Sequence, residues 1–400
     1  MSMRSFEAKT FVEKQAAEIK RTLGNEKIII ACSGGVDSTT CAKLTHQAIG
    51  DNLVCVFIDT GFMRLNEPKE VVETFSAPPL SLPIKLVDAR ERFMNALRGL
   101  EDAEEKRKSF RDTFYSVLSE AAREERCRYL VQGTIAPDVI ETKGGIKTQH
   151  NVLAQIGINP VKKYGFDVVE PVALLVKPQV REVANFLKIP SAIAKRQPFP
   201  GPGLSVRVVG EITPAKLDAV KKATLIVEEE LENMAEQYFA AVIENEAETD
   251  PLTEEVTKTA AEFFSTKEER VEVSLLKSTA TGIRRNVRFY GKIATIMITT
   301  EKGEPHKPRM DELFRFQDKI LKRNSELTRV LYNLKKPSAE APYLIAVRAV
   351  KTSDFITAQP VPISWNRLEK LSERIIQDCR DVSAVYYDIT PKPPATIEFE

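Results

Sequence analysis

The residues best suited to chemistry lie in one short run, Ser33-Gly34-Gly35-Val36-Asp37-Ser38. Residues 28–32, just before it, are apolar in the manner of a buried strand, and apolar residues at helical spacing follow it. Two adjacent glycines let the backbone curve around an anion, with its N–H groups and the start of the helix directed at a phosphate. The carboxylate of Asp37 would repel that phosphate unless a cation lay between them, so we expect Asp37 to be a Mg²⁺ ligand.

A simpler interpretation of Gly-Gly is an ordinary capped turn, and for the dipeptide alone it is the better one. The complete run directly after a buried strand is more specific, and its serine hydroxyls can donate further hydrogen bonds. It is not a Walker A loop, because neither Gly-Lys-Ser nor Gly-Lys-Thr occurs in the chain. The run therefore predicts a phosphate-binding loop that takes its lysine from elsewhere.

Composition excludes several classes of protein. The 400 residues are 42% hydrophobic, which is enough for a core and, at this length, predicts two domains. Lys and Arg number 58 against 57 Asp and Glu, so a net charge of +1 gives no general field for nucleic acid or membrane. Five cysteines without a Cys-x-x-Cys pair are typical of buried free thiols in a reducing cytosol. We recognise no signal peptide and no membrane-spanning run, and we expect a cytoplasmic protein.

Strand-like and helical segments alternate through the first half of the chain. This alternation predicts an α/β fold, a doubly wound, Rossmann-like parallel sheet with helices on both faces. Ligands collect at the carboxyl ends of such strands, where Asp59, Arg92, Gly133 and Thr134 fall. For Asp59, a role as a loop cap is an equally good interpretation. The expected strands are 28–32, 53–58, 84–87, 129–131 and 168–171, and the expected helices are 6–23, 101–128 and 178–187.

Two further polar features follow. Residues 138–151 interrupt the strand–helix rhythm and carry charges of both signs, which suits a lid that closes over phosphates and metal. A solvated surface loop explains the same composition slightly better. Lys177, at the start of an expected helix, could supply the cation that the phosphate loop lacks, although a lysine before a helix is common.

The pattern changes after residues 196–204, whose three prolines and two glycines predict a rigid connector. We expect domains at 1–203 and 204–400, the second being a smaller α+β domain with an insertion around 244–342. Its dense prolines make residues 388–400 a pre-organised tail. The expected helices are 214–238, 310–334 and 365–378, and the expected strands are 271–276, 292–299, 344–349 and 384–389.

The phosphate loop resembles the PP-loop of the N-type ATP pyrophosphatases, a superfamily with an adenine nucleotide alpha hydrolase-like fold. Four other segments, 133–138, 145–152, 196–204 and 392–398, resemble the ATP pyrophosphatase and dimerisation parts of the GMP synthetase family. The resemblance implies that ATP is the co-substrate and Mg²⁺ the cofactor. XMP is adenylated at its C2 oxygen with release of pyrophosphate, and ammonia then displaces AMP to give GMP.

The resemblance, together with the strand-end positions, assigns roles to individual residues. ATP binding falls to Ser33, Gly34, Gly35, Val36, Asp37, Ser38, Asp59, Gly133 and Thr134. Catalytic roles, including those of the lid, fall to Asp37, Asp138, Glu141, Lys143, Lys147, His150 and Lys177, with Asp37 also the metal ligand. XMP binding falls to Arg92, Thr148, Asn151, Arg288, Lys392, Ile397 and Glu398.

The same resemblance implies a homodimer, since the family's terminal segment reaches an XMP site at the dimer interface. No Gly-x-Cys-x-Gly nucleophile elbow is present, so we expect glutamine hydrolysis on a separate amidotransferase subunit. The chain departs from the family pattern at Gln149, at 153–155 and at Asn286. Alternatives are another N-type pyrophosphatase, either NAD synthetase-like or tRNA-thiolating, and a non-catalytic ATP-binding regulator.

Overall fold

The computed structural model describes residues 6–136, 159–194, 197–285, 287–335, 341–352 and 357–400. The chain divides into two compact units, Met1–Ala96 with Ser109–Gly201, and Leu97–Lys108 with Pro202–Glu400. The break near residue 201 lies close to the expected boundary. Leu97–Lys108, which we expected in the first domain, groups with the second unit instead.

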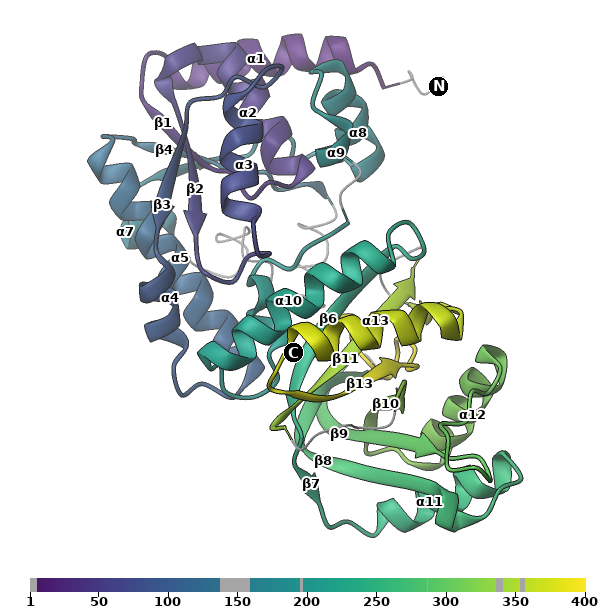
Figure 1. Ribbon diagram of the computed structural model, residues 1–400. Helices are drawn as coiled ribbons and strands as arrows, with labels where there is room; N and C mark the ends of the chain where they lie inside the picture. The colour runs from purple at the N-terminus through teal and green to yellow at the C-terminus, as the bar shows by residue number, and fades with distance from the viewer. Residues whose placement is uncertain (1–5, 137–158, 195–196, 286, 336–340, 353–356) are drawn as a thin grey trace. The chain divides into compact units, whose positions relative to one another are not determined.

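The first unit is built on a five-stranded parallel sheet in the order β3-β2-β1-β4-β5 (Figure 1). Since β1 is central and the chain proceeds outward from it on both sides, the predicted doubly wound α/β fold is confirmed. Helices α1, α2 and α8 contact one another. The strands are β1 (Ile28–Ala31), β2 (Leu53–Asp59), β3 (Ile84–Asp88), β4 (Tyr129–Val131) and β5 (Asp167–Val169). The helices are α1 (Ala8–Leu23), α2 (Val36–Ile49), α3 (Glu67–Ser76), α4 (Arg90–Leu97), α5 (Ala103–Glu124), α7 (Pro160–Tyr164), α8 (Lys177–Phe186) and α9 (Ser191–Ala194). The residues of α5 up to Lys108 belong to the second unit.

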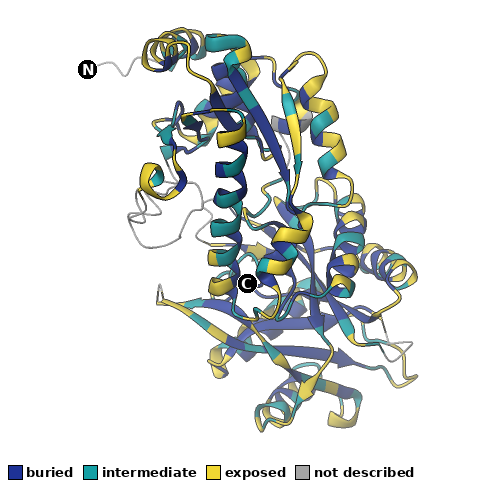
Figure 2. Ribbon diagram, turned by 90° about the vertical axis from the view of Figure 1, so that its left-hand side faces the viewer, coloured by how far each residue is buried: buried dark blue, intermediate teal, exposed yellow. Residues whose placement is uncertain are grey.

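The core of this unit follows from continuous apolar strands. Ile28, Ile29 and Ile30 are all buried, as expected for a central parallel strand covered on both faces. Figure 2 shows the contrast between these strands and the exposed outer faces of the helices. All five cysteines of the chain are free and buried, as predicted, and burial raises the pKa of Cys127 and of Cys379 to about 11.

The second unit holds an eight-stranded mixed sheet in the order β12-β11-β13-β10-β9-β8-β7, with β6 also paired to β11. The predicted α+β character of this half is confirmed. The strands are β6 (Gln237–Glu244), β7 (Ala247–Glu248), β8 (Val271–Arg284), β9 (Val287–Ile298), β10 (Leu327–Asn333), β11 (Tyr343–Lys351), β12 (Gln359–Pro360) and β13 (Val382–Asp388). The helices are α10 (Pro214–Glu230), α11 (Leu252–Phe263), α12 (Met310–Arg323) and α13 (Trp365–Asp378).

Two expectations for this unit were wrong. The helix expected over 214–238 ends at Glu230, where Asn233 at φ 62° breaks the helical path, and β6 follows. The helix expected over 310–334 ends at Arg323, and the buried stretch after it forms β10 because it pairs with two strands. Strands β7 to β10 of the main sheet lie within residues 244–342, where we expected an insertion, and the insertion itself stays a prediction.

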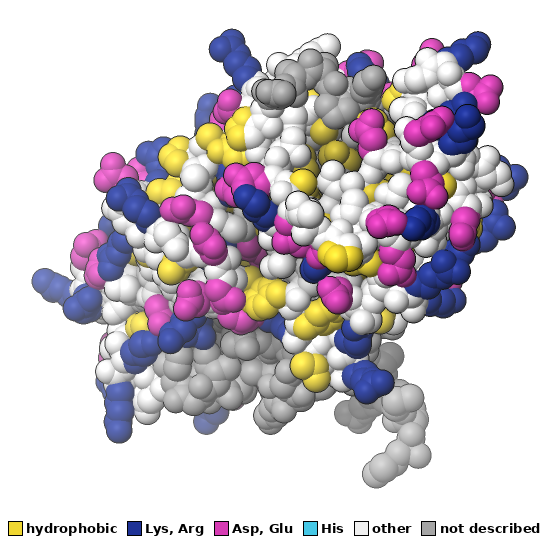
Figure 3. Space-filling model, turned by 90° about the horizontal axis from the view of Figure 1, so that it is seen from below, with side chains coloured by type: hydrophobic (Ala, Val, Ile, Leu, Met, Phe, Trp, Pro, Cys, Tyr) yellow, Lys and Arg dark blue, Asp and Glu magenta, His cyan; other side chains and the backbone are white. Residues whose placement is uncertain are grey.

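Surface composition agrees with the balanced charge of the sequence. Figure 3 shows Lys and Arg side chains interspersed with Asp and Glu over the face in view. Among the described residues, no helix has both the length and the apolar character needed to cross a bilayer.

Candidate functional site

The phosphate loop connects β1 to α2. The N–H of the buried Cys32 still donates to the carbonyl of Val56, 2.8 Å away, so the sheet holds the chain up to the loop. Gly34 has φ 74°, a conformation that glycine adopts without steric cost. Gly35 precedes α2 without any side-chain cap, which leaves the N–H groups of the first helical turn available to an anion.

Hydrogen bonds inside the loop hold its shape. The hydroxyls of Ser33 and Ser38 lie 3.0 Å apart, and the Ser33 Oγ accepts from the Gly35 N–H at 3.4 Å. The Ser38 hydroxyl donates to the Gly35 carbonyl at 3.1 Å. Both serines therefore shape the same turn, and either hydroxyl can be redirected to a phosphate oxygen without unfolding it.

Lys177, at the start of α8, lies against this loop. Its Nζ is 2.6 Å from Asp37 Oδ2 and 2.9 Å from Oδ1, in the first turn of α2. The side chains of Lys177 and Asp37 are 37% and 28% exposed, so the pair remains accessible to a ligand. The fold thus brings Lys177 and Asp37, which are 140 positions apart in the sequence, into direct contact beside the loop.

The segment after β4 packs directly on the loop. A Cβ added at Gly133 would lie 3.0 Å from the Ser38 nitrogen and 3.1 Å from the Asp37 carbonyl carbon. No larger residue fits there unless the start of α2 moves. The next residue, the buried Thr134, donates to Glu170 Oε1 at 2.6 Å, just beyond β5. Sequence reasoning gave Glu170 no role, since one carboxylate at a strand end carries no signal of its own.

Asp59 is the last residue of β2 and accepts a hydrogen bond from the Gly61 N–H at 2.9 Å, the capping contact that was its alternative role. Arg90 Nε lies 3.7 Å from Asp59 Oδ2 and pairs more closely with Asp88, at 2.6 Å. Its hydrogen bonds hold the pKa of Asp88 down to about 2. A contact with nucleoside at Asp59 stays a prediction.

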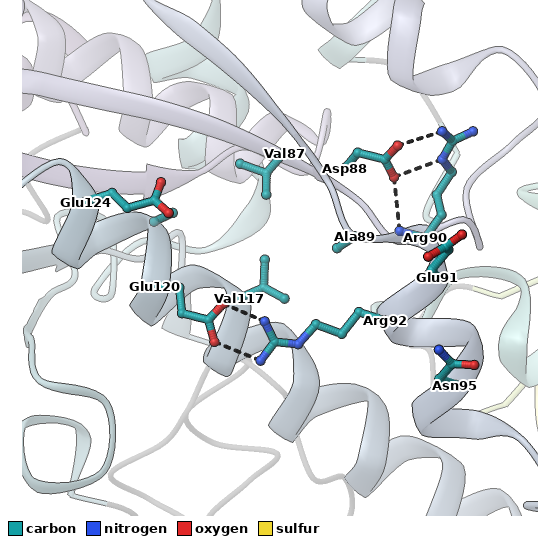
Figure 4. Close-up of a pocket in the computed structure, with 11 residues that line it drawn as sticks. Val87, Asp88, Ala89, Arg90, Glu91, Arg92, Asn95, Val117, Glu120 and Glu124 are labelled. Atoms are coloured by element: carbon teal, nitrogen blue, oxygen red, sulfur yellow. Dashed lines mark hydrogen bonds and ion pairs between the residues drawn. The ribbon is translucent and has the colours of Figure 1, made fainter.

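Two open hollows adjoin Asp88 and Arg90, of about 930 and 420 Å³. Figure 4 shows the larger one, where Arg92 points at Glu120. The Arg92 guanidinium donates to both carboxylate oxygens of Glu120, at 2.5 and 2.8 Å, and to Ser116 at 2.8 Å. These hydrogen bonds lower the pKa of Glu120. Arg92 must therefore exchange a carboxylate partner before it can bind an anionic substrate.

In the second unit, the tail carries Lys392, Ile397 and Glu398. Backbone hydrogen bonds of 2.8 and 3.0 Å join Lys392 to Ala358. Ile397 packs against the apolar core, and both carboxylate oxygens of Glu398 accept from the buried Arg207, at 2.9 and 3.0 Å. The tail is thus an ordered part of this unit, in agreement with its dense prolines.

Sequence reasoning missed a buried charge cluster beneath the tail. Arg329 on β10 and Arg348 on β11 both pair with Asp388 at the end of β13, at 2.8 and 2.7 Å, and all three side chains are fully buried. Both arginines also donate to the Thr396 carbonyl, at 2.9 and 3.0 Å. A single arginine within each apolar strand was the available signal, because a buried cation needs a partner.

Burial and charge act in opposite directions in this cluster. Burial lowers the pKa of Arg329 to about 9, and Arg348 adds to the effect. For Asp388, burial alone would raise the pKa, but the two arginines outweigh it and hold the pKa below its usual value. The cluster is therefore ionised and mutually dependent.

Arg288, on β9, pairs with Glu104, and burial lowers the pKa of the arginine. The predicted lid and substrate residues Asp138, Glu141, Lys143, Lys147, Thr148, His150 and Asn151 lie outside the described residues, as do Gln149 and Asn286. In the part of the chain that the structure describes, no group of three or more His, Cys, Asp or Glu side chains could hold a metal.

Known proteins match both halves of the chain. The family model described as NAD synthase matches residues 8–205, and the GMP synthase C terminal domain matches residues 338–399. One of the subunits of the glutamine-hydrolyzing GMP synthase of Sulfurisphaera tokodaii is 42% identical over 398 residues, covering 99% of this chain and 100% of the relative. The corresponding subunit from Methanopyrus kandleri is 40% identical over 395 residues, with the same coverage. Among solved structures, an NMN synthetase from Francisella tularensis is 18% identical, with a TM-score of 0.39, over 50% of this chain and 79% of that one.

Proposed function

Because the chain belongs to the family of these glutamine-hydrolyzing GMP synthase subunits, we propose that it is the ligase subunit that makes GMP from XMP, ATP and ammonia. The supporting observation is identity along the whole chain, joined to a phosphate loop with Lys177 beside it. The C2 oxygen of XMP attacks the α-phosphorus of ATP and pyrophosphate leaves. Ammonia then attacks C2 and AMP leaves with the oxygen.

In this reaction the loop 33–38 binds the pyrophosphate part of ATP. Backbone N–H groups and the start of α2 supply partial positive charge, and the hydroxyls of Ser33 and Ser38 add donors. Gly133 leaves room for the loop, and Thr134 is held by Glu170. Positioning and charge neutralisation are what such phosphoryl chemistry needs from a protein.

Lys177 and Asp37 have complementary roles in this proposal. Lys177 neutralises the leaving pyrophosphate, and Asp37 is the ligand for Mg²⁺. A partly exposed carboxylate next to a phosphate loop fits magnesium, which commonly takes one or two carboxylates together with phosphate oxygens and water. When bound, Mg²⁺ would supply charge neutralisation across the phosphates. The lysine must leave Asp37 for this to happen, and its partly exposed position permits that movement.

XMP binding completes the proposal. We assign it to Lys392, Ile397 and Glu398 in the tail, to Arg288 and Arg92, and to Thr148 and Asn151 in the lid. The remaining residues of the lid, Asp138, Glu141, Lys143, Lys147 and His150, would close over the bound phosphates. We further propose that ammonia comes from a separate amidotransferase, because the relatives are themselves named as single subunits of a glutamine-hydrolyzing enzyme. A cytoplasmic location and a homodimer, the latter implied by the family resemblance, are also part of the proposal.

The test is a product assay on the purified chain. With XMP, ATP, Mg²⁺ and ammonium we expect GMP, AMP and pyrophosphate in equal amounts, and with glutamine in place of ammonium we expect none. A parallel assay with nicotinate adenine dinucleotide in place of XMP tests for NAD synthase activity, because the NAD synthase family model matches the first half of the chain. Formation of ADP and phosphate, or turnover in that assay without XMP turnover, would contradict the proposal.

A further inference from the structure

The segment Leu97–Lys108, which belongs to the second unit, carries a lysine that the proposed reaction does not use. The side chain of Lys106 is fully buried, and its Nζ lies 2.9 Å from the Val208 carbonyl and 2.5 Å from Glu400 Oε2. A buried ammonium is costly unless it is paired, so this contact must be part of the stable fold. The neighbouring Arg107 donates to the Glu400 carbonyl.

Hydrogen bonds hold both the side chain and the backbone of Glu400. Its Oε1 accepts from the Gly210 N–H at 2.8 Å, while its own N–H donates to the Val206 carbonyl at 3.2 Å. Glu398, two residues earlier, binds Arg207. Between them Phe399 is buried, with the Arg329 guanidinium 4.2 Å from its ring centre. A shift of the tail by one residue would bury the wrong side chains, so the Lys106–Glu400 pair helps to set which tail residues face outward.

The same helical turn also contacts the other segment to which we assign XMP. Glu104 pairs with Arg288 on β9 and, at 2.6 Å, with Arg107. Asp102 caps the turn by accepting from the Glu104 and Glu105 N–H groups, both at 2.9 Å. Residues 102–107 therefore form one short rigid element that contacts both β9 and the tail.

We propose that Lys106 is a positioning residue for XMP: through Glu400 it fixes the tail so that Lys392, Ile397 and Glu398 are presented together. The inference rests on the proposed function, because those tail residues are assigned to XMP there. Lys106 touches no reacting atom, and its effect is expected in substrate affinity and not in the chemistry of ATP.

The experiment compares Lys106→Met with Lys307→Met by calorimetric titration with XMP and, separately, with Mg²⁺-ATP. Lys307 is the control, since it is a lysine of the same unit that pairs with a glutamate, Glu369 at 2.5 Å, and neither residue belongs to the tail or to residues 206–211, which hold Lys106 and Glu400. We expect Lys106→Met to weaken XMP binding about tenfold or more, with ATP binding within about twofold of the native chain. Lys307→Met should leave both affinities unchanged.

Glu400→Gln is the milder second variant, read if Lys106→Met fails to fold in circular dichroism. It keeps the size of the side chain and should also weaken XMP binding. The double variant, Lys106→Met with Glu400→Gln, should bind XMP no more weakly than the single variant with the lower affinity. If the native chain binds XMP and both single variants bind it equally well, the positioning role is wrong. If the native chain binds no XMP, the proposed function fails first and this inference with it.

Discussion

The phosphate loop and the tail are two opposite ways to build a binding segment. The loop 33–38 is shaped mainly by its own hydrogen bonds, and its charged pair, Asp37 and Lys177, remains partly exposed. After β13 the tail forms only isolated bridges, and it is held by cations from distant strands, among them the fully buried Arg329 and Arg348, which donate to the Thr396 carbonyl. The charged pair beside the loop stays accessible to a ligand, whereas the charges that hold the tail stabilise the fold. Substitutions in the two regions should therefore separate activity from stability.

The largest effect is expected at Asp388. Asp388→Asn leaves two buried guanidiniums without their shared carboxylate, and we expect a loss of about 3–5 kcal/mol in the unfolding free energy. Urea denaturation followed by the fluorescence of Trp365, the one tryptophan of the chain and part of α13, measures it. Asp381→Asn, an exposed residue just before β13, should change stability by no more than about 0.5 kcal/mol. Equal effects of the two substitutions would contradict the role of the cluster.

Next in size is the loss of the loop's lysine. Lys177→Ala should slow XMP-dependent pyrophosphate release by about 10²–10³, because a preorganised charge at the transferring phosphate is removed. The urea midpoint followed by far-UV circular dichroism, which reports on the helices of both units, should not change, since the pair with Asp37 is partly exposed. Arg181→Ala, one turn further along α8 and exposed, is the control. A rate within about threefold of the native chain would show that Lys177 does not act on phosphate.

A smaller effect is expected at Gly133. Gly133→Ala adds one methyl group 3.0 Å from the Ser38 nitrogen, so the start of α2 must move by a few tenths of an ångström. We expect kcat/KM for ATP to fall about tenfold, with XMP affinity unchanged. The backbone at Gly133 is not in the left-handed region, and the substitution therefore tests contact and not strain. Unaltered ATP kinetics would mean that the loop tolerates the displacement.

The most gradual effect is that of pH on the tail region. The pKa of Asp388 is lower in the folded chain than its unfolded value of about 4, so its contribution to stability is complete above that pH. It is lost as the pH falls from about 4 through the folded pKa. Between pH 5 and pH 3, roughly, the urea midpoint of the native chain should fall more steeply than that of Asp388→Asn. Parallel slopes would show that Asp388 is not ionised in the fold.

The sequence was most informative where structure is local. The order of strands and helices in the first unit followed from apolar runs and from the loop at residues 33–38, because a parallel sheet repeats the same unit. It failed at β6 and β10, where a helical pattern continues into a segment that pairs with strands distant in sequence. Only tertiary contacts determine that these two segments form strands and not helices.

The same division applies to the site. The contact of Lys177 with the loop agrees with one of two interpretations of that residue, the cation that the phosphate loop lacks, and not with the ordinary lysine before a helix. Lys106, Arg207 and Glu170 were not anticipated, since each acquires its partner only through folding. Arg92 was assigned to XMP from the family resemblance and its position at a strand end, and its pairing with Glu120 could not be seen in the sequence.

Because all five cysteines are buried, the native chain should react little with thiol-labelling reagents. A maleimide dye would find no exposed sulfur among them, so one cysteine introduced at Leu174, which is 91% exposed, would take the dye alone. Placed three residues before Lys177, that dye would report nucleotide arriving at the loop in real time, without removal of any native residue from the core.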